Sequence, residues 1–141
     1  MHRVYLDNSA TTPLLPEVLE AMRPYFIDRF GNASSIHHHG QETRAAVEAA
    51  RESVAALIGC RASEVVFTSG GTESIILAVK AARDLAGVER GQVVLPVTAH
   101  AAFQKACYYL GLEPVLVDVD PVTFRAVPSL VEQAITDRTV L

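Results

Sequence analysis

The stretch TSGGTES, residues 68–74, places two glycines and several hydroxyl side chains between the apolar runs 65–67 and 75–79. If a strand precedes it and a helix follows, the helix begins with unpartnered backbone N–H groups that suit a phosphate. The alternative is a tight turn in which Ser69 or Thr72 only caps the helix. The residues alone leave both interpretations open. Neither GxxxxGK(S/T) nor GxGxxG spacing is present, which argues against a P-loop or a dinucleotide fingerprint.

His100 is the second residue with chemical potential. It follows the apolar segment 92–97, so in a parallel sheet it lies at the same carboxyl edge as the glycine stretch. An imidazole there can stack on a flat ligand or move a proton. The alternative is a histidine at a helix start whose nitrogen pairs with the backbone, and the residues alone favour that one.

Other clusters of polar side chains are less informative. The triplet at 37–39 is all histidine, but adjacent side chains point in different directions and no carboxylate or cysteine completes a zinc spacing, so we predict no metal site. Asp118 and Asp120 end a strand and begin a turn, as is common for solvated aspartates. Cys60 and Cys107 lie outside any CxxC spacing and are expected to be small buried residues.

The elements that must position these residues alternate along the chain. Pro16 opens a short helix that Pro24 should end or kink at Arg23, and a longer helical pattern runs over 41–58 and stops at Gly59. Beyond it the sequence predicts strands at 64–68, 92–97 and 114–119 and helices at 72–86, 101–110 and 128–136. This alternation predicts an α/β fold with three layers, in which helices flank a largely parallel sheet.

Size and charge narrow the class of protein. The 141 residues suit one domain, half of them are hydrophobic, and the formal net charge is −4. A chain without a basic field is not expected to bind nucleic acid or an anionic membrane. The N-terminus has no long apolar run, so we expect neither a signal peptide nor a membrane span, and a cytoplasmic protein.

Three motifs together carry a family resemblance: YLDNSATTP at 5–13, FGNASSIH at 30–37 and VFTSGGTES at 66–74. In this order they resemble the opening third of cysteine desulfurases, which are class V aminotransferase-like enzymes of the type I pyridoxal-phosphate fold. Residues 74–84 and 98–106 also resemble the pyridoxal-phosphate decarboxylases and the sphingosine-phosphate lyase group. Ala99 stands where a desulfurase usually has a glutamate.

The resemblance implies a cofactor site. Gly70, Gly71 and Thr72 match the residues that bind the phosphate of pyridoxal 5′-phosphate, and His100 matches the histidine that stacks on its ring and takes part in proton transfer. Residues 1–15, with Asn8, Ala10 and Thr11, match an N-terminal arm that approaches the active site. Residues 16–141 match an incomplete large cofactor-binding domain, because Thr139-Val140-Leu141 reads as the first half of a further strand.

The implied reaction converts cysteine to alanine and an enzyme-bound persulfide, whose sulfur passes to an acceptor protein for iron-sulfur cluster or thio-cofactor assembly. The resembled enzymes are homodimers. Their anchoring lysine, pyridinium aspartate and persulfide cysteine come later than residue 141, and neither Lys80 nor Lys105 stands in the anchoring motif. The chain alone is therefore expected to be inactive. The alternatives are a decarboxylase or carbon-carbon lyase, and a non-catalytic remnant that binds phosphate or pairs with a related subunit.

Overall fold

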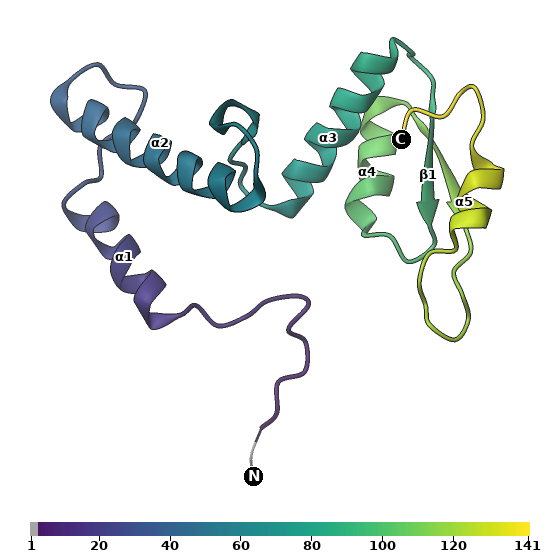
Figure 1. Ribbon diagram of the computed structural model, residues 1–141, viewed down its shortest axis with the longest axis horizontal. Helices are drawn as coiled ribbons and strands as arrows, with labels where there is room; N and C mark the ends of the chain where they lie inside the picture. The colour runs from purple at the N-terminus through teal and green to yellow at the C-terminus, as the bar shows by residue number, and fades with distance from the viewer. Residues whose placement is uncertain (1–2) are drawn as a thin grey trace. The chain divides into compact units, whose positions relative to one another are not determined.

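In the computed structural model, which describes residues 3–141, the chain divides into two units, with the boundary in the sequence between Val66 and Phe67 (Figure 1). The first unit is helical. Its elements are α1 (Pro16–Ile27), α2 (His38–Ile58) and a single 3-10 turn, η1 (Ala62–Glu64). Within the described residues, no helix is both long enough and apolar enough to cross a membrane.

Of the two outcomes predicted for Pro24, an end of the helix at Arg23 is wrong, since α1 continues to Ile27, whereas a kink there stays a prediction. Proline lacks an N–H group and so removes one bond to the preceding turn, yet its carbonyl still accepts. The backbone N–H groups of Asp28 and Arg29 donate to the Pro24 carbonyl at 2.9 and 2.8 Å and close the last turn beyond it.

The long helix α2 ends as predicted but begins earlier. Gly59 follows it with a left-handed φ of 72°, and its N–H donates to the Ala55 carbonyl. At the other end the helix starts at His38 rather than near Gln41, because the Nδ1 of His37 accepts a hydrogen bond from Gly40 N at 3.3 Å. One histidine of the triplet therefore has a capping role.

The second unit is an α/β structure built around a parallel sheet. Strands β1 (Gln92–Pro96) and β2 (Glu113–Val117) pair in parallel, with Gln92 opposite Glu113. On the other side of β1, Gln92 N donates to Arg138 O at 2.8 Å and Val140 N donates to Gln92 O at 2.9 Å, so Gln92 and Thr139 form an isolated parallel bridge. The helices are α3 (Gly71–Ala86), α4 (Ala101–Leu110) and α5 (Pro128–Ala134).

The order of these strands places helices on both faces of the sheet. The chain passes from β1 to β2 through α4, and from β2 through α5 to Thr139 on the other side of β1. These two connections run in opposite directions across the sheet. If both are right-handed, as such connections usually are, α4 and α5 lie on opposite faces. Figure 1 shows α4 and α5 on either side of the strands, with α3 packed on α4. The predicted three-layer α/β fold is confirmed for this unit. Its core is formed by Val79, Val93, Leu95, Ala106, Cys107 and Leu112.

The strand predicted at 64–68 is wrong. Residues 62–64 form η1, and residues 65–68 are not part of the sheet, in which β1 pairs with β2 and the segment 138–141. Val66 and Phe67 remain 64% and 48% exposed. An apolar run with strand propensity becomes a strand only where a neighbouring strand supplies its hydrogen bonds and buries its side chains.

Candidate functional site

The glycine stretch and His100 lie at the starts of α3 and α4. The turn at 87–91 sends α3 antiparallel to β1, and α4 starts directly after the carboxyl end of β1. In Figure 1, α4 begins beside the carboxyl end of β1, whereas the first turn of α3 lies further from the strands, beyond α4. Because residues 64–68 form no strand, the glycine stretch does not follow a strand of this sheet, and its expected position at the edge beside His100 stays a prediction.

The first turn of α3 presents free donors. Its N-cap is Gly70, in an extended conformation, and the Ser74 N–H makes the first helical bond by donating to the Gly70 carbonyl at 3.1 Å. Within residues 3–141, the N–H groups of Gly71, Thr72 and Glu73 have no hydrogen-bond acceptor. The alternative in which Ser69 or Thr72 caps the helix is wrong, because among the described residues neither side chain accepts a bond from the first N–H groups of α3. These donors remain available to an anion.

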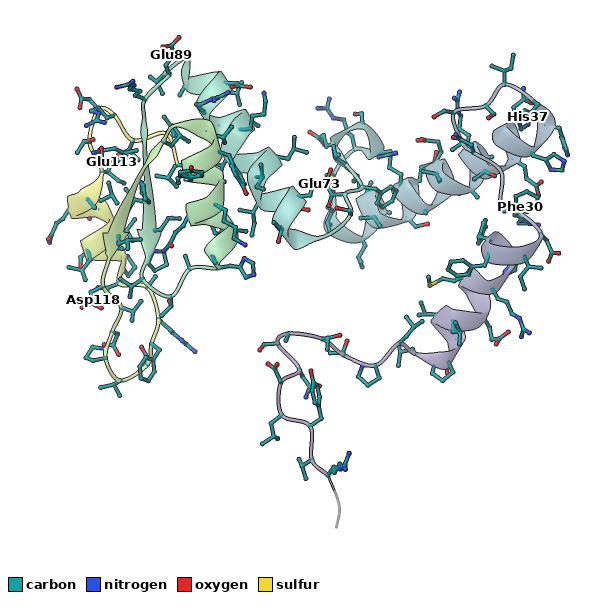
Figure 2. All side chains as sticks on the ribbon, turned by 180° about the vertical axis from the view of Figure 1, so that it is seen from behind. Phe30, His37, Glu73, Glu89, Glu113 and Asp118 are labelled. Atoms are coloured by element: carbon teal, nitrogen blue, oxygen red, sulfur yellow. The ribbon has the colours of Figure 1, made fainter. Side chains whose placement is uncertain are left out.

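A set of side-chain bonds fixes the shape of the loop. The Glu73 carboxylate accepts from the Ser69 hydroxyl at 2.6 Å and from the Ser69 N–H at 2.7 Å, and these two bonds lower the pKa of Glu73. Thr68 Oγ1 and Ser74 Oγ lie 2.7 Å apart, so one hydroxyl donates to the other. Figure 2 shows Glu73 at the start of α3. The sequence did not point to these contacts, because Ser69 and Glu73 lie four positions apart rather than the three of a capping box.

Space beside the loop is open. A Cβ atom built on Gly70 or Gly71 meets nothing within 4 Å. By contrast, a Cβ built on Gly40 in the first unit lies 2.3 Å from the Ser35 carbonyl oxygen, so that glycine serves tight packing. Free N–H donors, the Thr72 hydroxyl and open space together fit a phosphate monoester such as that of pyridoxal phosphate.

His100 is the N-cap of α4. Its Nδ1 accepts a hydrogen bond from Ala102 N at 3.1 Å, which is the backbone pairing that the residues alone favoured. An Nδ1 that accepts is unprotonated, so the neutral ring carries its proton on Nε2. The residue is exposed, and among the described residues it makes no hydrogen bond to the glycine loop. The capping bond leaves the ring faces free, and their stacking role stays a prediction.

The proposed arm residues belong to the first unit. The N–H groups of Ala10 and Thr11 donate to the Asp7 carbonyl at 3.1 and 3.4 Å, and the Tyr5 hydroxyl donates to the same oxygen at 2.9 Å. Asn8, Ala10 and Thr11 are all exposed on this turn. Their part in an active site stays a prediction.

The lysines and cysteines have other surroundings. Lys80 pairs with Asp84 one turn further along α3, and Lys105 is exposed on α4. Cys107 is fully buried, and burial raises the pKa of its thiol, which disfavours a thiolate. Cys60 is half-buried beyond Gly59, and its Sγ donates to the Arg61 carbonyl at 3.5 Å. No cluster of three or more His, Cys, Asp or Glu residues suited to a metal ion occurs in the described part of the chain.

Comparison with known proteins gives a consistent set of relatives. The family model described as Aminotransferase class-V matches residues 4–141. A cysteine desulfurase IscS of Dictyoglomus turgidum is 42% identical over 98% of this chain, which corresponds to 36% of that relative. Two solved structures, a NifS-like protein and SspA in complex with cysteine, align with TM-scores of 0.84 and 0.81 at 32% and 30% identity. They cover 98% and 93% of this chain and 38% of each structure. The chain thus spans just over a third of the proteins that it matches.

Proposed function

The chain belongs to the aminotransferase class-V family, and we propose that its second unit forms the phosphate site of a pyridoxal-phosphate-dependent cysteine desulfurase. The observation that carries this proposal is the row of unpartnered N–H groups at the start of α3, in an open loop of a helix that packs on α4, the helix that His100 caps. The desulfurase relative matches across residues 74–106 as well, which favours this reaction over a decarboxylase or lyase.

Each residue has a defined task in this proposal. The N–H groups of Gly71 and Thr72, with the positive end of α3, hold the phosphate, and the extended Gly70 lets it approach closely. The Thr72 hydroxyl donates a further bond. His100 lays its ring face against the pyridine ring while its Nδ1 keeps the cap on α4, so Nε2 is the atom that holds or moves a proton.

When bound, pyridoxal phosphate supplies an electron sink for bonds at the α-carbon of an amino acid. We propose that the substrate is cysteine, that alanine and a thiol-bound persulfide are the products, and that the sulfur passes to an acceptor protein. Neither Lys80 nor Lys105 is proposed as the covalent anchor, because one is paired with Asp84 and both lie on exposed faces of their helices. A homodimer in the cytoplasm is the proposed assembly and location.

The first test compares ligands that differ by one group. The chain should bind pyridoxal 5′-phosphate more tightly than pyridoxal, which lacks the phosphate, and more tightly than inorganic phosphate, which lacks the ring. Equal affinity for pyridoxal and for pyridoxal 5′-phosphate would contradict a phosphate site at the start of α3. Borohydride treatment followed by peptide mass spectrometry should find no pyridoxyl group on Lys80 or Lys105, and stoichiometric labelling of either would overturn its exclusion.

A further inference from the structure

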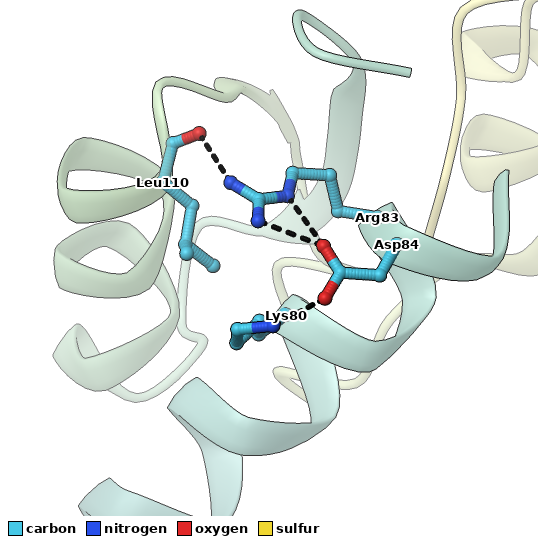
Figure 3. A network of polar contacts seen from close by, with 4 residues as sticks. All are labelled: Lys80, Arg83, Asp84 and Leu110. Carbon is cyan, nitrogen blue, oxygen red and sulfur yellow. Dashed lines mark hydrogen bonds and ion pairs between the residues drawn. The ribbon is translucent and has the colours of Figure 1, made fainter. Parts of the chain in front are cut away.

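Arg83 joins the two helices that carry the candidate site. Its Nη1 donates to the Leu110 carbonyl of α4 at 3.3 Å, while its Nε and Nη2 donate to Asp84 Oδ1 at 3.1 and 2.7 Å. The other carboxylate oxygen of Asp84 accepts from Lys80. Figure 3 shows this network between α3 and the last turn of α4. Within the described residues, no other side chain of α3 hydrogen-bonds to α4.

The contact has a local cause at the end of α4. Gly111 ends the helix with a left-handed φ of 68°, which leaves the Leu110 carbonyl among the acceptors that the helix itself does not use. A guanidinium beside a helix C-terminus also complements the negative end of the helix dipole. The Arg83 side chain is only 25% exposed, so the bond is partly shielded from water.

The rest of the α3–α4 interface is apolar and largely small. Val79 of α3 packs in one core cluster with Ala106 and Cys107 of α4, and Ile75 and Phe103 pack against it. Apolar contacts stabilise burial without fixing direction, whereas a guanidinium held on two sides has defined geometry. Arg83 therefore adds a directional contact to an otherwise apolar interface between the helices.

We infer that Arg83 is a positioning residue for the cofactor site, because it holds the phosphate loop of α3 and His100 of α4 in fixed relation from the opposite ends of both helices. The inference rests on the proposed function, since it concerns the two groups proposed to contact pyridoxal phosphate. The helix from Gly71 to Arg83 is about 18 Å long at roughly 1.5 Å per residue, so a rotation of about 3° moves the loop by roughly 1 Å. Displacements of about 1 Å are enough to disrupt a site that needs two contacts at once.

The test uses a matched pair of variants of the chain. Arg83→Met removes the bond to α4, whereas Lys80→Met removes the same unit of positive charge from the same helix without touching α4. We expect Arg83→Met to lower the affinity for pyridoxal 5′-phosphate about tenfold and to change the affinity for inorganic phosphate by no more than about twofold, because only the larger ligand needs both helices. Lys80→Met should leave the ratio of the two affinities unchanged.

A second measurement does not depend on the cofactor. Residual dipolar couplings of the backbone amides report the angle between α3 and α4, which should change in Arg83→Met and stay unchanged in Lys80→Met. If Arg83→Met fails to fold, Asp84→Ala replaces it, since that variant removes the acceptor that holds the guanidinium while the arginine stays in place.

The outcomes separate the inference from the proposed function. An unchanged helix angle in folded Arg83→Met overturns the positioning role, as does an equal loss of both ligands, which marks a general structural effect. Another outcome is a helix angle that changes in Arg83→Met while the parent chain binds pyridoxal 5′-phosphate no more tightly than inorganic phosphate. That result supports the contact between α3 and α4 and refutes the proposed cofactor site.

Discussion

Gly71 offers a way to remove one donor of the phosphate loop while keeping its helix. It is the first residue of α3, where proline is well tolerated because the N–H of that position has no partner within the helix. Gly70 in front of it has an extended ψ of −179°, which is compatible with a following proline. Gly71→Pro should therefore fold and keep its melting temperature, while its backbone nitrogen no longer donates.

The magnitude follows from the kind of bond that is lost. A hydrogen bond to a charged group contributes about 1.5–3 kcal/mol, so loss of one donor should weaken pyridoxal 5′-phosphate by roughly 10- to 150-fold. Gly71→Ala is the matched control. It keeps the N–H, and its new Cβ meets nothing within 4 Å, so its affinity should stay within about twofold of the parent chain.

Titration calorimetry with pyridoxal 5′-phosphate gives the dissociation constants, and far-ultraviolet circular dichroism verifies the helices. Unchanged affinity in a folded Gly71→Pro would refute the assignment of this N–H to the phosphate. An equal loss of affinity in Gly71→Ala would show that open space at this position matters, and a hydrogen bond from the Gly71 N–H would then not be needed to explain the effect.

Three further predictions concern other residues. His100→Asn and His100→Ala both remove the imidazole ring, so both should weaken the binding of pyridoxal phosphate. Asparagine keeps a capping acceptor, so only the alanine variant should lose about 1 kcal/mol of unfolding free energy in urea. Gly40→Ala should destabilise its unit by about 1–3 kcal/mol in the same assay, because a Cβ there lies 2.3 Å from Ser35 O. Hydrogen bonds from the Thr123 backbone and hydroxyl lower the pKa of Asp120 below its ordinary value of 3.8. Its contribution to stability is complete above that ordinary value and is lost as pH falls through the lowered one, so Asp120→Asn should flatten the acid limb of the unfolding curve.

The elements that sequence reasoning located well are those with local signals. Gly59 and Gly111 end α2 and α4 in the left-handed conformation that glycine adopts easily, and the apolar runs between turns became β1 and β2. The run at 64–68 has equally good strand propensity, yet its state depends on a partner strand that no local pattern reveals.

The residues of the candidate site were likewise predictable only where the signal in the sequence is local. The glycine loop was visible because its residue types and its place before a helix are local features. The bond from Arg83 to the Leu110 carbonyl joins residues that are 27 positions apart, and nothing in the sequence marks either of them. His37 was hidden for a different reason, since histidine is not among the preferred capping residues and its capping bond depends on the ring orientation.

The two helix starts at the candidate site differ in a way that bears on function. On α4 the N-cap side chain of His100 accepts from Ala102 N, so part of that terminus is already satisfied. On α3 the N-cap is a glycine without a side chain, and the nearest carboxylate, Glu73, is turned back to Ser69. A serine or aspartate at the N-cap stabilises a helix by about 1 kcal/mol relative to alanine but by only a few tenths relative to glycine, so α3 loses little stability by having Gly70 there. A ligand phosphate can then take the place of the capping side chain, because the same donors make charge-assisted bonds that exist only when the cofactor is bound.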